Sequence, residues 1–165
     1  MDTKKILEII AAIAQKIEAE KDFLTELDNA IGDGDHGINL ARGFKSVEAK
    51  LPTFADKDIG AILKGVGTAL VSTVGGASGP LYGTAFMKAG NLCKGKTELA
   101  AEEFAAALEA AIGGVQMRGK AVEGEKTMLD ALCPAYKALK ENLDGGKNLI
   151  DALSAAVAAA AAGGE

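Results

Sequence analysis

Hydrophobic residues recur every three or four positions along most of the chain, which is the spacing of amphipathic helices. The first half begins with a predicted helix over roughly residues 3–20, whose apolar face carries Ile6, Ile9, Ile10, Ile13 and Ile17. Three further helices are predicted in this half: a short one with Leu24 and Leu27, one from Ile38 to just before Pro52, and one from Ile59 to Gly75-Gly76, capped by Asp56 or Asp58.

The second half shows four more helical segments, each with its own starting signal. These signals are Pro80 after Ser78-Gly79, Thr97, the variant capping box of Thr127 with Asp130, and Asn148 with Asp151. The last segment runs into a tract of alanines. No stretch alternates with the period of two that a β-strand would show. We therefore predict an all-α fold, an antiparallel helical bundle, in which residues 1–165 form a single domain.

Composition and charge limit the kinds of core and of binding partner that this chain can have. Hydrophobic residues make up 48% of the chain but aromatic residues only 4%, so the core is expected to consist mainly of Ala, Leu, Ile and Val. The formal charge of −5 argues against nucleic-acid binding, which requires a basic face. We see neither a membrane span nor a signal peptide. Cys93 and Cys133 have no metal-site spacing, and we expect buried thiols in a reducing cytoplasm.

The segment from Asp28 to Asn39 combines acidic residues, glycines and the single histidine of the chain, His36. Asp33 and Asp35 are two residues apart, so an extended loop would point both carboxylates to one side. Asp28 belongs to the last turn of the preceding short helix, and a tight loop would bring it back toward the other two. Three converging carboxylates repel one another unless a cation neutralises them, and oxygen ligands select Mg²⁺ or Ca²⁺.

An ordinary surface turn is the alternative interpretation of this segment, because Asp and Gly are common turn residues. An EF-hand loop does not fit, because the twelfth position counted from Asp33 is Phe44 rather than glutamate. Three carboxylates are too few to enclose a cation. An open Mg²⁺ shell is usually completed by water and phosphate oxygens, so the segment suggests a phosphate-containing ligand.

Two other glycine-containing segments precede predicted helices. Residues 74–83 (VGGASGPLYG) consist mainly of small residues, include the Ser78 hydroxyl and run directly into a predicted helix. The free amides and the positive dipole end of a helix N-terminus favour the binding of anions. Residues 113–120 (GGVQMRGK) and 124–128 (GEKTM) form a basic stretch that we expect to be a loop. The alternatives are a closely packed helix–helix turn for the first segment and a solvated connection for the second.

Residues 90–97 (GNLCKGKT) match the P-loop pattern of nucleoside triphosphatases letter for letter. A P-loop must follow a buried strand of a parallel sheet, and this chain has no predicted strands. We therefore interpret the match as a helix C-terminus, with Gly95 as its cap and Thr97 as the cap of the next helix.

Taken together, these motifs resemble the nucleotide-binding L subunit of dihydroxyacetone kinases. The resemblance rests on residues 24–28 (LTELD), 31–37 (IGDGDHG) and 42–44 (RGF), on residues 74–83, and on residues 118–121 (RGKA) with 124–130 (GEKTMLD). These motifs occur in the order that the family shows and cover essentially the whole chain. The implied fold is a barrel of eight antiparallel helices with the nucleotide at one end.

The resemblance also implies roles for individual residues. Asp28, Asp33 and Asp35 would hold two Mg²⁺ ions that bridge the phosphates of ADP or ATP, and with His36 they would form the catalytic group. The other implied nucleotide contacts are Gly37, Ile38 and Asn39 beside His36, Ala77 and Ser78 at the phosphates, and Gly119 and Met128 at the base and ribose.

The implied activity needs partners. In this family a separate K subunit holds dihydroxyacetone covalently through a histidine, and in bacterial forms a phosphohistidine protein of the phosphotransferase system recharges the bound ADP. Two alternatives stay open: the nucleotide domain of a fatty-acid kinase, whose acidic loop lacks the run Asp35-His36-Gly37, and a non-catalytic nucleotide- or metal-binding module that regulates a partner.

Family members continue beyond the alanine-rich tract with a further segment and a final helix. The resemblance therefore implies that the last barrel helix is missing from this sequence. We expect apolar surface to be exposed on the neighbouring helices, and nucleotide binding to be weaker than in a longer chain.

Overall fold

The computed structural model describes residues 1–30 and 32–164, which are almost entirely helical, as predicted. Ile31 of the recognised motif lies outside the described residues. The helices are α1 Thr3–Ala19, α2 Lys21–Asn29, α3 His36–Lys50, α4 Ile59–Thr73, α5 Ser78–Leu92, α6 Ala101–Gly119, α7 Leu129–Asp144 and α8 Leu149–Gly164, with a 3₁₀ turn η1 at Leu51–Phe54. The only β-type pairing in this part of the chain is an isolated bridge between Asp2 and Glu98.

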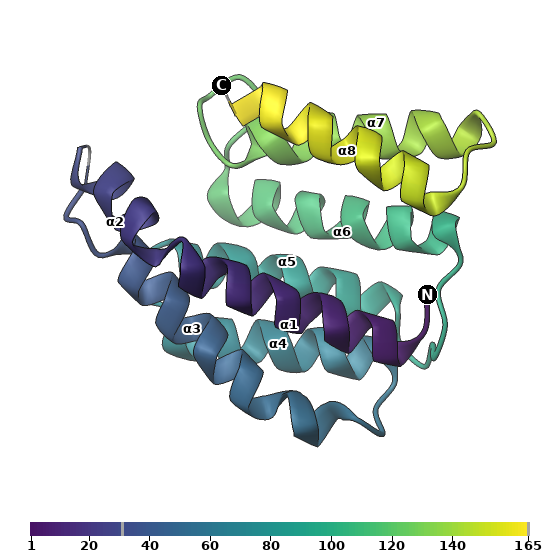
Figure 1. Cartoon of the computed structure of the whole chain (residues 1–165), viewed down its shortest axis with the longest axis horizontal. Coiled ribbons are helices and arrows are strands. Elements are labelled where there is room, and N and C mark those ends of the chain that lie inside the picture. The colour runs from purple at the N-terminus through teal and green to yellow at the C-terminus, as the bar shows by residue number, and fades with distance from the viewer. Residues whose placement is uncertain (31, 165) are drawn as a thin grey trace.

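The long helices form two groups that lie side by side (Figure 1). Helices α1, α3, α4 and α5 surround the largest apolar core, which includes Ile10, Leu40, Ile62 and Leu70. Helices α6, α7 and α8 share a smaller core around Leu139. The two groups are joined because α5 packs directly on α6. The short helix α2 stands at the edge, next to the start of α3 (Figure 1).

Helices α4 and α5 pack with their backbones in direct contact at two pairs of glycines. A Cβ on Gly67 would lie 2.7 Å from the carbonyl oxygen of Gly83, and a Cβ on Gly83 would lie 2.8 Å from that of Gly67. Gly60 and Gly90 repeat the arrangement, with corresponding distances of 2.7 and 2.8 Å. These distances leave no room for a side chain, so the glycines set the separation of the two helices.

Several predicted helix starts are confirmed by their capping bonds. The Asp58 Oδ1 atom accepts a hydrogen bond from the Ala61 amide at 3.0 Å at the start of α4. At the start of α8, the Asn148 Oδ1 atom accepts one from the Asp151 amide, also at 3.0 Å. Helix α3 begins at His36, two residues earlier than the apolar pattern indicates. The Asp28 side chain of α2 caps this start by accepting a hydrogen bond from the His36 amide.

The predicted start of the sixth helix at Thr97 is wrong. Helix α6 begins at Ala101, and the Glu103 side chain accepts a hydrogen bond from the Ala100 amide at 2.9 Å. The residues before it run alongside the N-terminus, where the Leu99 amide donates to the Met1 carbonyl at 2.9 Å. Tertiary contacts therefore hold this segment outside the helix. The P-loop match is the end of α5, as predicted, followed by Gly95 at φ 77°.

The loop predicted at residues 113–119 is also wrong, because α6 continues to Gly119. Gly114 is buried against α5, where a Cβ would lie 2.9 Å from the Lys88 Cγ atom. This glycine allows close helix packing rather than a turn. The loop begins at Lys120, whose φ of 55° ends the helix in the left-handed conformation.

Cys93 and Cys133 are buried free thiols, as predicted. Cys93 belongs to the core of α1, α3, α4 and α5, and Cys133 to a cluster formed mainly by α6 and α7. Burial raises the pKa of both thiols. Because the thiolate is the reactive form, neither cysteine is activated as a nucleophile.

An apolar groove of about 340 Å³ lies between α1 and the layer of α5, α6 and α7. Its walls include Ile9 and Ile13 of α1, Phe86 of α5, and Phe104 and Leu108 of α6. The further helix expected from the resemblance, and the apolar surface that its absence would expose, stay predictions. Within the described part of the chain, no helix is both long and apolar enough to cross a bilayer.

We predict that Gly67→Ala destabilises the protein by about 1–3 kcal/mol, because the added methyl group must push α4 and α5 apart. Gly113→Ala is the matched control, since Gly113 is exposed within α6 and nothing lies within 4 Å of its Cβ position. That substitution should stabilise the protein by about 0.5–1 kcal/mol through helix propensity. Urea unfolding of both variants tests the prediction, and equal effects would contradict the packing argument.

Candidate functional site

The three predicted aspartates converge at the α2–α3 connection. Asp28, Asp33 and Asp35 each offer a carboxylate oxygen, and these oxygens lie within 4.8 Å of one another. Asp28 is half-buried, whereas Asp33 and Asp35 are exposed. Three negative charges at this separation repel one another, and their oxygens are the donors that Mg²⁺ and Ca²⁺ prefer. The donor set therefore fits a hard divalent cation whose remaining ligands come from water or an anionic ligand.

The Asp28 side chain holds this loop together. Its Oδ2 atom accepts hydrogen bonds from the backbone amides of Asp35, at 3.0 Å, and His36, at 3.2 Å. These amides lie at the start of α3 and would otherwise lack a partner there. Two glycines permit the fold: a Cβ on Gly32 would lie 2.3 Å from the Asp28 Oδ1 atom, and Gly34 has a φ of 73°.

The residues after the acidic loop form the first turn of α3. His36 is its first residue and is half-buried, and Ile38 is 53% exposed. Gly37 is buried against α2, where a Cβ would lie 2.1 Å from the Lys21 carbonyl oxygen and 2.5 Å from the Thr25 Oγ1 atom. These predicted nucleotide contacts therefore lie beside the aspartates, on the N-terminal turn of a helix.

Asn39 differs from the other residues of this turn because its side chain is occupied within the protein. It is 8% exposed, and its amide donates to the Asp35 Oδ2 atom and accepts from Arg42. Arg42 lies within the recognised motif but is not among the predicted site residues. The spacing of Asp35, Asn39 and Arg42 along one helix face is the signal that could have identified it.

The second predicted segment lies at the start of α5. Ala77 is the N-cap position and Ser78 the first helical residue, whose hydroxyl donates to the Gly75 carbonyl at 3.3 Å. Gly75 touches α3, since its Cβ position is 3.1 Å from the Asn39 Nδ2 atom. The N-terminus of α5 is thus held beside the turn that carries the acidic loop, and its dipole favours an anion there.

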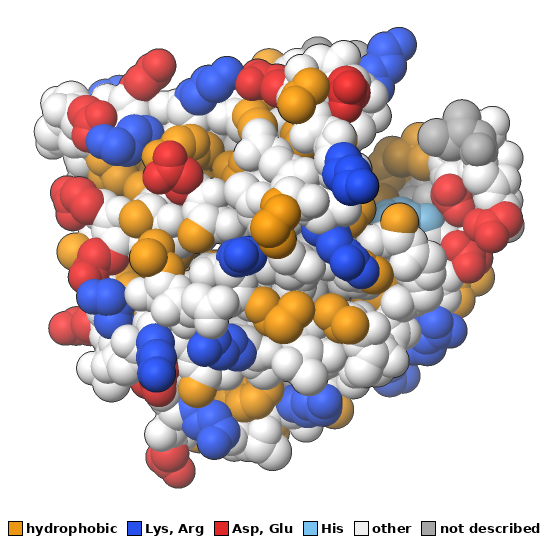
Figure 2. Space-filling view, turned by 180° about the vertical axis from the view of Figure 1, so that it is seen from behind, with side chains coloured by type: hydrophobic (Ala, Val, Ile, Leu, Met, Phe, Trp, Pro, Cys, Tyr) orange, Lys and Arg blue, Asp and Glu red, His pale blue; other side chains and the backbone are white. Residues whose placement is uncertain are grey.

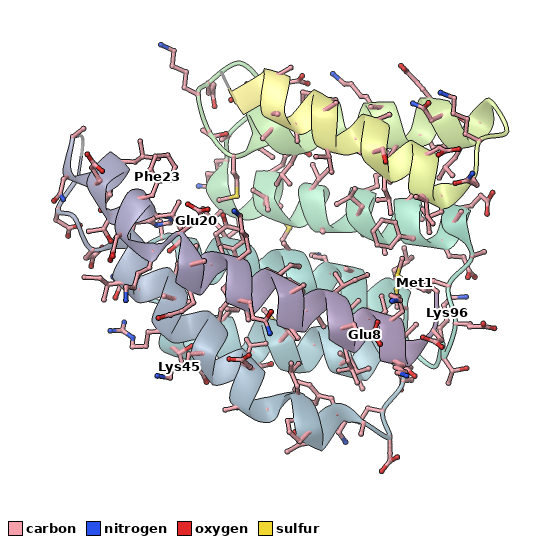
Figure 3. All side chains as sticks on the ribbon, viewed as in Figure 1. Met1, Glu8, Glu20, Phe23, Lys45 and Lys96 are labelled. Carbon is pink, nitrogen blue, oxygen red and sulfur yellow. The ribbon has the colours of Figure 1, made fainter. Side chains whose placement is uncertain are left out.

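The third segment joins α6 to α7 and packs on the first turns of α5. A Cβ on Gly119 would lie 3.2 Å from the Leu81 Cδ2 atom, and Met128 belongs to the same apolar cluster as Leu81. The predicted residues of all three segments are therefore gathered at one end of the bundle (Figure 1). Figure 2 shows acidic side chains beside the histidine at this end, facing a hollow in the surface. Met1 and Lys96 mark the opposite end (Figure 3).

Asp130 organises the α6–α7 loop from the first turn of α7. Its carboxylate accepts hydrogen bonds from the Thr127 amide, at 2.8 Å, and the Gly124 amide. These bonds lower the pKa of Asp130, because they stabilise its charged form. The predicted capping box is confirmed in part: Asp130 accepts from the Thr127 amide, whereas the N-cap position of α7 is Met128 and the Thr127 hydroxyl oxygen accepts from the Leu129 amide.

Fold and site together define an all-helical domain that can hold a cation and an anionic ligand at one end. Residues 30–165 match the DAK2 domain family, and the chain belongs to this family. This chain is similar to the protein of Escherichia coli named "PEP-dependent dihydroxyacetone kinase, ADP-binding subunit DhaL". The two are 46% identical over 137 residues, which cover 83% of this chain and 65% of the relative.

A second relative and a solved structure are also dihydroxyacetone kinase proteins. The chain is 43% identical to the PEP-dependent dihydroxyacetone kinase 2, ADP-binding subunit DhaL of Listeria innocua over 167 residues, covering 100% of this chain and 77% of the relative. The crystal structure of the dihydroxyacetone kinase of C. freundii superimposes with a TM-score of 0.79 at 28% identity, over 99% of this chain and 28% of that one. The chain thus spans about two thirds to three quarters of the length of these two DhaL relatives.

We predict that Asp130→Asn lowers the melting temperature at neutral pH, because the substitution weakens the bonds to Thr127 and Gly124. A lowered pKa means that the charged form stabilises the fold above the usual titration range of Asp, and that this contribution is lost as the pH falls through the lowered value. The difference between the original chain and the variant should therefore be constant from about pH 7 to 5 and shrink below about pH 4. Asp56→Asn, in the turn after η1, controls for the loss of one negative charge, and a pH-independent difference would contradict the prediction.

Proposed function

We propose that this chain is the Mg²⁺- and ADP/ATP-binding subunit of a dihydroxyacetone kinase. The observation that carries the proposal is the convergence of Asp28, Asp33 and Asp35 at the bundle end that also holds the N-terminus of α5. The names of the DhaL relatives, at 46% and 43% identity, support ADP as the nucleotide and dihydroxyacetone as the substrate of the complete enzyme.

In this proposal each of the three segments binds one part of the nucleotide. The three aspartates hold two Mg²⁺ ions, which neutralise phosphate charge when bound, and His36 lies on the phosphate side. Ala77 and Ser78 present helix amides and a hydroxyl to the phosphates. Gly119 and the apolar side chain of Met128 contact the base and ribose, and both lie against the cluster that includes Leu81. Phosphoryl transfer depends mainly on such positioning and charge neutralisation, which a rigid helical bundle provides.

The chain would not act alone. We propose that a K subunit presents dihydroxyacetone to the nucleotide end, and that a phosphohistidine protein of the phosphotransferase system recharges bound ADP. The words "PEP-dependent" in the names of both DhaL relatives support this donor over free ATP. The pair of buried thiols suits a reducing cytoplasm, where such a system would operate.

We predict that Asp33→Ala and Asp35→Ala each lower the affinity for ADP in the presence of Mg²⁺ by more than about 100-fold, because each removes a cation ligand. Isothermal titration with and without Mg²⁺ measures the effect. Both side chains are exposed, so the helical circular dichroism should stay unchanged.

Asp22→Ala is the matched control for these variants, since Asp22 is an exposed carboxylate in the first turn of α2. It should bind ADP as the original chain does. If the original chain bound ADP equally well with and without Mg²⁺, the proposed metal site would be wrong.

We also predict that the purified chain does not phosphorylate dihydroxyacetone by itself. The sequence contains one histidine, His36, which the proposal assigns to the nucleotide. Adding a K subunit together with a phosphohistidine donor should restore turnover, and ATP in place of that donor tests the other phosphoryl source. Turnover by the chain alone would contradict the division of roles. Nucleotide binding without turnover in the complete mixture would favour a regulatory module instead.

A further inference from the structure

A chain of hydrogen bonds connects the acidic loop to the end of α4. The Asn39 Nδ2 atom donates to the Asp35 Oδ2 atom, and the Arg42 Nη2 atom donates to the Asn39 Oδ1 atom at 2.7 Å. The Arg42 Nε atom in turn donates to the Thr73 carbonyl oxygen at 3.2 Å. This series of hydrogen bonds therefore ends at a backbone carbonyl of a different helix, 31 residues farther along the sequence than Arg42.

The geometry of α3 makes this series of hydrogen bonds possible. Asp35, Asn39 and Arg42 are separated by four and three residues, so they lie on one face of the helix. This face meets the segment after α4, where Gly75 has no side chain to displace the Asn39 amide. Both polar atoms of the buried Asn39 side chain are hydrogen-bonded within the protein, which fixes the orientation of its amide.

We propose that Asn39 and Arg42 are positioning residues that orient the Asp35 carboxylate toward the cation. This inference rests on the proposed function. The amide of Asn39 fixes the Oδ2 atom of Asp35, and Arg42 fixes Asn39 against the backbone of Thr73. The exposed Asp35 side chain is thereby held in one orientation, with its Oδ1 atom available as a ligand.

The two donors of Arg42 are the essential feature of this arrangement. A guanidinium group donates through Nε and Nη2 at a fixed angle, which lets one side chain reach both Asn39 and Thr73. A lysine ammonium keeps the charge but cannot reproduce this fork. Residues that orient a metal ligand typically change metal affinity by about 10- to 100-fold when they are removed.

The test is the Mg²⁺ concentration that supports half-maximal ADP binding, measured by titration with the full chain. Arg42→Met keeps the apolar stem and removes both donors, and it should raise this concentration about 10- to 100-fold. Arg42→Lys should raise it by a similar factor. At saturating Mg²⁺ the ADP affinity of both variants should approach that of the original chain. Lys45→Met is the matched control, because Lys45 is an exposed cation farther along α3 (Figure 3), and it should leave the Mg²⁺ dependence unchanged.

Melting temperatures without ligand separate positioning from stability. A variant that weakens ADP binding by the same factor at every Mg²⁺ concentration, in step with a lower melting temperature, would assign Arg42 a structural role only and overturn the inference. Normal Mg²⁺ dependence in Arg42→Met, or its full restoration in Arg42→Lys, would overturn it as well. If the original chain showed no Mg²⁺-dependent ADP binding, the proposed function would fail, and this inference with it.

Discussion

The Asp28 carboxylate is the group on which the whole candidate site depends. It closes the loop between α2 and α3 by accepting the amides of Asp35 and His36, and it supplies one of the three converging oxygens. The amides offset part of its charge, but the repulsion from Asp33 and Asp35 remains. The backbone of the folded loop is thus fully hydrogen-bonded at the start of α3, while its three negative charges are left uncompensated by the protein groups around them.

The rest of the bundle serves to bring two other segments to the same place. The connections after α2, α4 and α6 follow alternate helices of an antiparallel arrangement, so they lie at one end. Direct contacts link them in series. Asn39 touches Gly75 at the end of α4, and Leu81 near the start of α5 touches Gly119 at the end of α6. The site is therefore a continuous structure rather than three independent loops.

The sequence predicted those features that depend on neighbouring residues. The all-α class followed from helical spacing. Asn148 with Asp151 was predicted as a helix start, and Asp58 was one of the two predicted caps of α4, because capping bonds join residues close in sequence. The convergence of the aspartates was predicted because Gly32 and Gly34 mark a tight loop beside a helix end.

Features set by distant parts of the chain were missed. Thr97 has the chemistry of a cap, but contacts with the N-terminal residues hold its segment extended. Gly114 suggests a turn locally, although its role is to let α5 approach α6. Helical spacing can relate Arg42 to Asn39 but cannot reveal its bond to the Thr73 carbonyl on another helix. The individual roles of the site residues stay predictions, because they concern contacts with a nucleotide and a cation rather than contacts within the fold.

The close packing of α4 on α5 has a mechanical consequence for ligand entry. These helices touch through backbone atoms at Gly67 and Gly83, so the Gly75–Ser78 segment between them is anchored to a rigid pair. Helix α2 has no buried residue, and its Phe23 side chain is 55% exposed (Figure 3). Elements with few buried contacts open at the lowest free-energy cost. The α4–α5 side of the candidate site is consequently the more rigid one, and the side formed by α2 opens at the lower free-energy cost.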